Sequence, residues 1–253
     1  MRAIILAAGR GLRLLQPEDR QLPKCLLRFD GLSLLERHLR MLRGVGVEEI
    51  VLALGFRHEL IEAELDRLAW LPRPEIVINR HFELGSVLTL HTVADAMTRG
   101  GDVLLMDADV LYDERIEDAL EAGRTPVNRL LIDRDIEDGE EPVKVCLREG
   151  VPVELRKQLA ADSEYDVIGE SVGFFRFTHS AALRLAALVA GYVANGRAQM
   201  PHEEAVRDLI IERTYPVEIA DVTGAAWIEI DYAEDLARAT NEVLPQLQVP
   251  ALR

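Results

Sequence analysis

The chain has 253 residues, a formal net charge of −15 and 49% hydrophobic residues, so it is long enough to bury a sizeable core as a globular domain. The negative charge argues against non-specific binding to nucleic acid or to an anionic membrane, because both depend on positive charge. The N-terminal apolar run is only six residues long, and no stretch reaches the length of a membrane span. We therefore expect a cytoplasmic protein with no membrane insertion. The two cysteines, Cys25 and Cys146, match no metal spacing and are expected to be buried free thiols.

The first predicted element is a short buried strand over residues 2–7, which ends at Ala8-Gly9-Arg10-Gly11. Small residues at this point let backbone N–H groups approach a phosphate closely. Arg13 and Lys24 follow and could neutralise its charge. A tight turn with basic surface residues is an equally good interpretation of this segment taken alone.

Gly9 and Gly11 also have the spacing of the first two glycines of a dinucleotide-binding turn. Leu14 occupies the position of the third glycine, and no helix pattern opens directly from the loop. No ribose-binding acid is well placed either. These features disfavour an NAD-dependent dehydrogenase.

Strands and helices alternate through the first 140 residues. A capping box at Ser33 and Glu36 predicts a helix that ends at Gly44. Further strands are expected over residues 49–54, 75–79, 102–106 and 129–132, and further helices over residues 58–68, from Ser86, and over residues 113–123. This alternation predicts an α/β fold with a doubly wound, mostly parallel sheet.

The pattern changes near Pro142. Residues 143–148 and 151–156 flank Glu149-Gly150, which is a hairpin signal. A strand over residues 171–177, helices over 180–195 and 201–212, strands over 217–220 and 227–230, and a helix over 232–244 follow. We expect a single domain, residues 1–253, in which a nucleotide-binding half (1–140) carries a smaller, hairpin-containing acceptor subdomain (141–253).

Two groups of carboxylates are expected where strands end. Asp107 and Asp109 follow the strand at residues 102–106, and Glu229 and Asp231 end a late strand. Ligands of open parallel sheets sit beyond the carboxyl ends of the strands. Mg²⁺ needs only one or two protein carboxylates, because water and phosphate complete its shell. A solvated loop aspartate is the alternative for Asp109.

The run L-A-A-G-R-G-L-R-L at residues 6–14, followed by Pro23-Lys24, resembles the signature of nucleotidyltransferases that join an NTP to a phosphorylated small molecule. Leu12 replaces the usual Ser or Thr, which removes a hydroxyl at that point. Asp-Ala-Asp at 107–109 and the segment W-I-E-I-D-Y-A-E-D-L at 227–236 resemble motifs of the branch that acts on phosphocholine, inositol phosphate or aminoethylphosphonate. These motifs span most of the chain.

The resemblance implies a Mg²⁺-dependent cytidylyltransferase with CTP as its nucleotide and Asp109 and Asp231 as metal ligands, with Asp107 and Glu229 as weaker candidates for the metal. Arg13 would hold the β and γ phosphates, and Lys24 would bridge toward the attacking phosphate. Lys144 would be a second catalytic cation by family position, with a plain surface lysine as the alternative. Nucleotide contacts are expected from the loop, from the chain after the third strand and from the first aspartate: Leu6, Ala7, Ala8, Gly9, Gly11, Asn79, Gly85, Ser86 and Asp107. A simple helix N-cap is the alternative for Ser86.

A cationic acceptor would be received by carboxylates and an aromatic wall. The candidates are Glu170, Glu203, Glu204, Tyr192, Trp227 and Glu229. First-turn helix acids are the alternative for Glu203 and Glu204, and a polyol or sugar is the alternative acceptor. The histidines show no ligand spacing and receive no role.

The expected partners are CTP and a phosphorylated small molecule, without nucleic acid, and a homodimer is left open. Two other functions also remain open. One is a sugar-1-phosphate uridylyl- or thymidylyltransferase, and the other is a non-catalytic nucleotide-binding module on the same fold.

Overall fold

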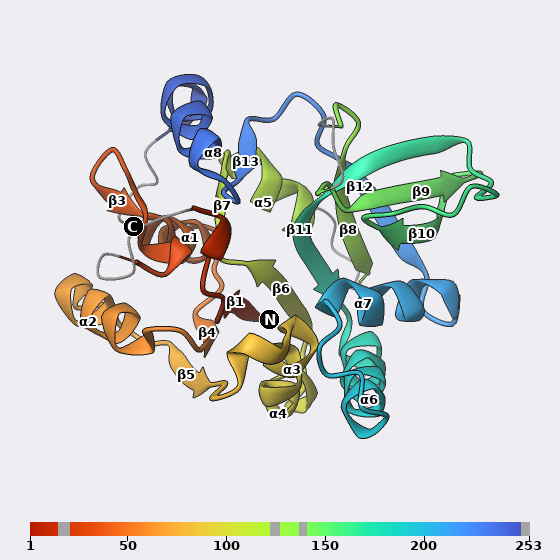
Figure 1. Cartoon of the computed structure of the whole chain (residues 1–253), viewed down its shortest axis with the longest axis horizontal. Coiled ribbons are helices and arrows are strands. Elements are labelled where there is room, and N and C mark those ends of the chain that lie inside the picture. The colour runs from red at the N-terminus through yellow and green to blue at the C-terminus, as the bar shows by residue number, and fades with distance from the viewer. Residues whose placement is uncertain (15–20, 122–126, 137–140, 249–253) are drawn as a thin grey trace.

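The computed structural model describes residues 1–14, 21–121, 127–136 and 141–248. Its centre is a large sheet with the strand order β10-β9-β11-β6-β1-β4-β5, and β8 and β12 extend it beside β11. Strands β1 (Arg2–Ala7), β4 (Glu49–Leu54), β5 (Glu75–Ile78) and β6 (Val103–Asp107) run parallel to one another. Their carboxyl ends therefore lie at one edge of the sheet (Figure 1).

Helices cover both faces of these strands because successive strand residues point to opposite sides. Ile5 faces a core built with α1 (Leu34–Gly44), α2 (His58–Leu68) and α5 (Glu114–Glu121). Ile4 faces the other core, which is built with α3 (Ser86–Thr92), α4 (Ala94–Thr98), α6 (His179–Ala194) and α7 (His202–Ile211). The predicted doubly wound α/β fold is confirmed.

Helix α1 begins where the capping signal places it. Ser33 Oγ accepts a hydrogen bond of 3.1 Å from the backbone N–H of Glu36. Leu35, Leu39 and Leu42 then fall on one face and are fully buried. The predicted helix from Ser86 is present but breaks at Val93 into α3 (Ser86–Thr92) and α4 (Ala94–Thr98).

The second half is organised around the long strand β11 (Val167–Phe177), which runs antiparallel to β6, β8 (Asn128–Asp133) and β9 (Lys144–Arg148). It begins four residues before the predicted strand because Val167 and Ile168 pair with β9. The predicted hairpin joins β9 to β10 (Val151–Arg156). Glu149 and Gly150 occupy its turn with φ of 53° and 77°.

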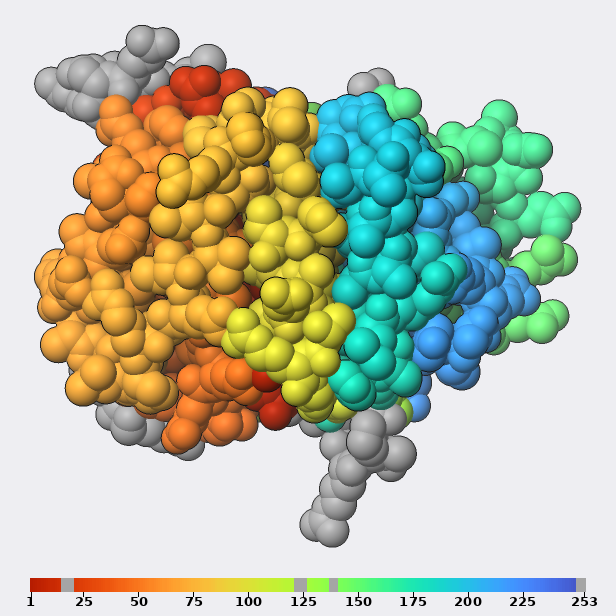
Figure 2. Space-filling view, turned by 90° about the horizontal axis from the view of Figure 1, so that it is seen from below, coloured from red at the N-terminus to blue at the C-terminus, as the bar shows by residue number. Residues whose placement is uncertain are grey.

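Helices α6 (His179–Ala194) and α7 (His202–Ile211) follow, and β12 (Val217–Asp221) pairs with β8. Figure 2 shows the yellow chain of α3 and α4 packed directly against the cyan chain of α6 and α7. The two halves are thus joined across one face of the sheet.

Two short pairings were not predicted. Strand β7 (Val110–Tyr112) pairs antiparallel with β13 (Trp227–Glu229), and β2 (Arg28–Phe29) pairs with β3 (Leu32–Ser33). The strand over residues 227–230 was predicted and forms β13, but β2, β3 and β7 are runs of two or three residues that carry too little periodicity to be recognised. The predicted last helix is also less regular than expected: α8 (Ala233–Arg238) continues as a π turn (Ala239–Val243) and a 3₁₀ turn (Leu244–Gln246).

Cys25 and Cys146 are buried free thiols, as predicted. Among the described residues, the helices are all too short or too polar to cross a bilayer.

Candidate active site

The basic loop and the distant carboxylates meet at the carboxyl edge of the parallel strands. Lys24 Nζ lies 2.8 Å from Asp109 Oδ2 and 2.6 Å from Asp231 Oδ1. Arg13 Nη2 lies 3.1 Å from the same Asp231 oxygen. Three segments far apart in sequence therefore form one charged cluster.

Local backbone geometry places the two cations. Gly11 has a φ of 61°, and a Cβ there would lie 3.0 Å from Cγ of Lys24, so the glycine lets the lysine stem cross the loop. Arg13 sits in a single 3₁₀ turn that follows Gly11, and Lys24 begins another one. Both side chains are thereby directed toward the strand ends.

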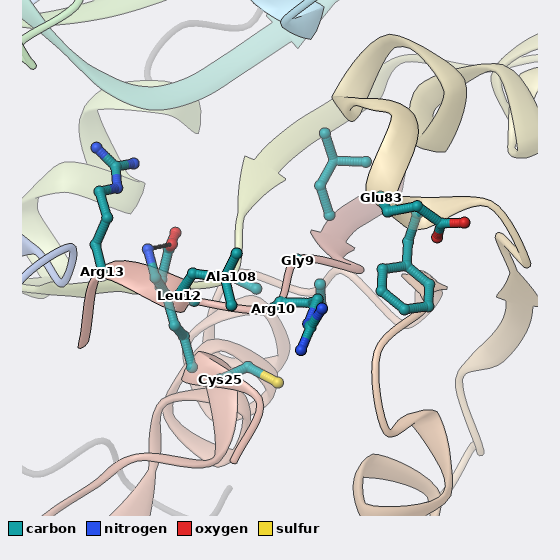
Figure 3. Close-up of a pocket in the computed structure, with 13 residues that line it drawn as sticks. Gly9, Arg10, Leu12, Arg13, Cys25, Glu83 and Ala108 are labelled. Carbon is teal, nitrogen blue, oxygen red and sulfur yellow. Dashed lines mark hydrogen bonds and ion pairs between the residues drawn. The ribbon is translucent and has the colours of Figure 1, made fainter. Parts of the chain in front are cut away.

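A cavity of about 520 Å³ opens beside this loop. It is lined by residues of β1, the glycine loop and the chain after β5: Leu6, Ala7, Gly9, Arg10, Gly11, Leu12, Arg13, Lys24, Cys25, Phe82, Glu83, Ala108 and Asp109. Figure 3 shows Gly9 and Arg10 between Arg13 on one side and Glu83 on the other. Backbone atoms, apolar side chains and cations on one concave surface suit a nucleoside carrying phosphates.

Pairing of β7 with β13 brings the two carboxylate motifs together, because the N–H of Ile230 bonds to the carbonyl of Asp109 at 3.0 Å. One carboxylate oxygen each from Asp109, Glu229 and Asp231 lie within 4.8 Å of one another. Three hard oxygen donors at this spacing fit a divalent cation such as Mg²⁺. Glu229, expected to contact the acceptor, thus lies in the carboxylate cluster itself.

The charges of this cluster are not balanced. Burial alone would lower the pKa of Lys24, but attraction by Asp109 and Asp231 outweighs it and holds the pKa above its ordinary value. The side chain of Glu229 is exposed to solvent but lies in a cleft crowded with protein atoms. Loss of hydration in these surroundings, followed by repulsion from Asp109 and Asp231, raises the pKa of Glu229 well above its usual range. The site favours additional positive charge.

A smaller cavity of about 290 Å³ adjoins the first one, and both include Arg13, Lys24 and Asp109. It extends along the sheet edge to Gly85, Ser86, Asp107, Lys157, His202 and Glu203. Gly85 permits this arrangement, because a Cβ there would lie 2.7 Å from the backbone of Gln199. The first turn of α3 is therefore locked against the chain that enters α7.

The expected nucleotide residues divide between the two cavities. Leu6, Ala7, Gly9 and Gly11 line the larger cavity, and Leu6, Ala8, Gly9, Gly85, Ser86 and Asp107 line the smaller one. Asn79 is in neither. It is only 2% exposed, and its side chain donates to Thr89 Oγ1 at 3.0 Å and accepts from the N–H of His81 at 2.9 Å. Asn79 therefore holds the loop after β5 from within the core.

The structure places Lys144, the expected second cation, outside the two cavities described above. Lys144 lines neither of them, and its Nζ donates to the carbonyl of Lys157 at 3.0 Å. Lys157 itself lines the smaller cavity, and its Nζ bonds to Glu141 Oε2 at 2.7 Å. Lys157 directly follows the end of β10, and its position after a predicted strand is the sequence feature that could have identified it as a site residue. The β9–β10 pairing places it one register step beyond Lys144.

Glu141 joins the two halves of the site. It pairs with Arg13 as well as with Lys157, and its Oε1 accepts from Tyr232 Oη at 3.1 Å. Hydrogen bonds from Lys157 and Arg13 lower the pKa of Glu141 to about 2. Sequence reasoning assigned nothing to Glu141 or Tyr232, because their partners come from distant segments.

The predicted acceptor residues do not all meet. Glu203 lines the smaller cavity, whereas Glu204 pairs with Arg156 at 2.8 Å outside it. Tyr192 is buried between α6 and α7, where its hydroxyl donates to Asp208 Oδ2 at 2.8 Å, so it forms part of the core and not of the site. Its apolar neighbours at helical spacing account for this position.

Glu170 and Trp227 line a third cavity, of about 520 Å³, which borders β13. Trp227 Nε1 donates to Asp133 Oδ2 at 2.8 Å, which fixes the indole against the cavity wall. Glu229 and Asp231 face both this cavity and the smaller one. The third cavity is strongly acidic and borders the site.

A parallel sheet whose strand ends carry a glycine loop, two cations and a carboxylate cluster is the arrangement of a nucleotidyltransferase. Residues 3–172 match the model of the MobA-like NTP transferase domain, and the chain belongs to this family. The predicted nucleotidyltransferase membership is confirmed.

Relatives extend the match along the chain. It is 27% identical over 242 residues to the bifunctional IPC transferase and DIPP synthase of Aquifex aeolicus, covering 94% of this chain but only 50% of that protein. It is 22% identical to the CTP:phosphoglutamine cytidylyltransferase of Campylobacter jejuni, over 93% of this chain and 98% of that one. The inositol-1-phosphate CTP transferase from T. maritima has a similar fold, with a TM-score of 0.75 and 23% identity over 97% of this chain and 95% of that one. The chain thus spans half of one relative and nearly all of the other two.

Proposed function

We propose that this protein is a Mg²⁺-dependent cytidylyltransferase that transfers CMP from CTP to a small phosphorylated or phosphonate alcohol or amine. The observation that carries the proposal is the convergence of Arg13 and Lys24, from the glycine loop, on Asp109 and Asp231. The similar proteins support CTP as the nucleotide, since the names of two of them include CTP. On this proposal residues 1–140 bind the nucleotide and residues 141–253 bind the acceptor.

In the proposed reaction, an oxygen of the acceptor's phosphate or phosphonate attacks the α-phosphorus of CTP. The new bond joins that oxygen to the α-phosphorus, the bond to the β-bridging oxygen breaks, and pyrophosphate leaves with the electron pair. A phosphomonoester has a second pKa of about 6 and is already ionised near neutral pH, so no general base is required. Positioning and charge neutralisation are then the tasks of the protein.

The residues present suit these tasks. The loop from Ala8 to Gly11 offers backbone N–H groups to the triphosphate, with Phe82 and Glu83 on the opposite wall for the nucleoside. Arg13 binds the β and γ phosphates, and Lys24 lies between the triphosphate and the acceptor. Lys157 takes the role first expected of Lys144, since it lines the shared cavity.

Asp109, Asp231 and the adjacent Glu229 would hold Mg²⁺. The ion, when bound, would neutralise charge on the phosphate oxygens. Lys24 bridges Asp109 and Asp231, so the lysine and a metal would share the same pair of carboxylates.

Pyrophosphate release tests the proposal. The protein is incubated with Mg²⁺ and each of CTP, UTP, dTTP, ATP and GTP, against a panel of phosphorylated amines, polyols and sugar 1-phosphates. We expect release with CTP and a non-sugar acceptor. Release with UTP or dTTP and a sugar 1-phosphate alone would establish the sugar nucleotidyltransferase instead. Tight CTP binding with no release for any acceptor would establish a non-catalytic nucleotide-binding module.

A further inference from the structure

The buried imidazole of His202, which lines the smaller cavity, has no role in the phosphate chemistry described above. His202 is 3% exposed, and its Nε2 makes no hydrogen bond within the residues that the structure describes. This nitrogen lies 3.9 Å from Asp107 Oδ1. Glu203 Oε2 is likewise buried without a hydrogen-bond partner in the described chain. Polar atoms buried in this way usually serve a ligand or water.

The imidazole of His202 is held firmly. Its backbone N–H donates to Ser86 Oγ at 2.8 Å. Its Nδ1 lies 3.3 Å from the same hydroxyl and 3.1 Å from Glu203 Oε2. A hydrogen on Nδ1 directed at Ser86 Oγ, with the negative carboxylate of Glu203 close to the same nitrogen, leaves Nε2 as a hydrogen-bond acceptor facing Asp107.

Asp107 is confined from the other side by Gly173 of β11. This glycine has a φ of 80°, and a Cβ there would lie 2.6 Å from Asp107 Oδ2. The carboxylate therefore occupies space that any other residue at position 173 would fill. Asp107 and His202 are thus fixed with their acceptor atoms facing each other.

The 3.9 Å between Asp107 Oδ1 and His202 Nε2 is too long for a hydrogen bond between these two atoms. It is short enough for one donor group to contact both. A primary ammonium carries three N–H donors and a positive charge, so it can donate to both Asp107 and His202, while the carboxylate of Glu203, which lines the same cavity, attracts its charge. A hydroxyl has only one hydrogen to donate, so it could form a hydrogen bond with Asp107 or with His202 but not with both.

A quaternary ammonium fits less well. It has no N–H to donate, and proteins bind it by enclosing it in aromatic faces. Among the described residues that line the smaller cavity, Phe82 is the only phenylalanine, tyrosine or tryptophan. Trp227, the aromatic residue expected to receive a choline-like group, lines the third cavity instead.

We infer that the acceptor carries a primary ammonium group and that Asp107, His202 and Glu203 bind it. This inference rests on the proposed function and names its acceptor class. Lys24 and Lys157 line the same cavity, so an acceptor held by its ammonium would present its phosphate or phosphonate to these two cations. Asp107, expected from the sequence to contact the nucleotide, then belongs to the acceptor.

Three acceptors of matched length test the inference: 2-aminoethyl phosphate, phosphocholine and 2-hydroxyethyl phosphate, each with CTP and Mg²⁺. We expect kcat/KM for the primary amine to exceed both others by about tenfold or more. Equal or better turnover of the other two would overturn the inference and leave the cytidylyltransferase proposal standing. Absence of CTP-dependent pyrophosphate release with every acceptor, polyol and sugar phosphates included, would instead overturn the proposed function.

Two variants locate the subsite. Glu203→Gln and His202→Gln should each raise KM for 2-aminoethyl phosphate about tenfold, leave KM for CTP within about twofold, and reduce the preference over 2-hydroxyethyl phosphate. Glu212→Gln removes one carboxylate at the far end of α7, where Glu212 pairs with Arg184, and serves as the matched control. Equal losses with all acceptors and an unchanged preference would show a merely structural role. Glu203→Gln keeps the test decisive if the His202 variant does not fold.

Discussion

Two acidic regions of this protein differ in how completely their charges are neutralised. Between α1 and α2, Glu64 Oε1 accepts from Ser33 at 2.8 Å, and its Oε2 accepts from Arg28 at 2.7 Å and Arg67 at 2.8 Å. Glu36 is similarly held by two arginines. In the cleft, by contrast, Asp107, Asp109, Glu203, Glu229 and Asp231 share Arg13, Lys24 and Lys157, and two of these cations also serve Glu141.

The pKa values reflect this difference. Hydrogen bonding from Arg67 and Ser33, with the nearby charge of Arg28, lowers the pKa of Glu64 to about 2 despite its burial. Burial, followed by repulsion from neighbouring carboxylates, raises the pKa of Glu229 well above its usual range. The α1–α2 network is complete and structural. The cleft lacks positive charge, which a metal ion and a cationic substrate group would supply.

The largest expected effect is in the cleft. Asp109→Asn removes one of the three clustered carboxylates and a partner of Lys24. We expect kcat to fall on the order of 10³-fold, because charge stabilisation of the reacting phosphates depends on this cluster. Steady-state pyrophosphate release measures the loss, and titration with Mn²⁺ followed by electron paramagnetic resonance measures metal affinity separately.

Glu64→Gln is the matched control, since it also removes a carboxylate charge, but from the neutralised network. It should keep kcat within about twofold of the wild type. If Asp109→Asn retained turnover and Mn²⁺ affinity as well as this control does, the cleft cluster would not be the metal site.

The second prediction compares two lysines of the hairpin. Lys157 lines the shared cavity, whereas Lys144 does not line it and donates from its Nζ to the carbonyl of Lys157. Lys157→Ala should lower kcat about 100-fold, and Lys144→Ala should change it less than about threefold. Both variants lose one positive charge, so net charge cannot explain a difference. The reverse order in the same pyrophosphate assay would restore Lys144 as the second cation.

These lysines show where sequence reasoning stopped. The glycine loop with Arg13 and Lys24 and the two carboxylate motifs are local patterns, and their positions at strand ends followed from the alternation of strands and helices. Lys144 begins β9 and Lys157 directly follows β10, and the sequence does not show which of the two lysines points into the cleft. That choice depends on the register of β9 against β10.

Other differences have the same origin. Asn79 and Tyr192 carry polar groups that the sequence placed at the site, but these groups form hydrogen bonds with Thr89 and Asp208 instead. His202 gave no spacing signal, because its partners Asp107 and Ser86 lie about a hundred residues away. Strand direction and helix periodicity are visible in sequence, whereas partners brought together by tertiary packing are not.

The third prediction concerns the space that Asp107 occupies. Gly173→Ala would place a Cβ 2.6 Å from Asp107 Oδ2 at a φ of 80°, so the carboxylate has to move. We expect KM for the acceptor to rise about tenfold while KM for CTP changes less than about twofold.

Gly150→Ala is a close control, because Gly150 has a φ of 77° but a Cβ there would meet nothing within 4 Å. Both variants should lose about 1 kcal/mol of stability from the left-handed backbone conformation, measured by urea unfolding. An equal change in acceptor KM in both would attribute the effect to backbone strain, and Asp107 would have no part in it.

The smallest expected effect lies in the neutralised network and concerns stability alone. The carboxyl of Glu64 has an ordinary pKa of 4.5 and a folded-state pKa of about 2, so its charged form stabilises the fold above pH 4.5. Because Arg28 and Arg67 are 42% and 51% exposed, solvent screening leaves about 1–2 kcal/mol of this contribution at pH 7. The contribution should decline as the pH falls from 4.5 and vanish near pH 2.

Urea unfolding of the wild type and Glu64→Gln at several pH values measures this difference directly. We expect the two free energies of unfolding to converge as the pH falls, because the wild-type carboxyl then becomes neutral like the amide. Shared acid effects on the other carboxylates cancel in the comparison. A gap of constant size down to pH 2 would mean that Glu64 contributes through shape and hydrogen bonding and not through its charge, and the contrast with the cleft would then lose its electrostatic basis.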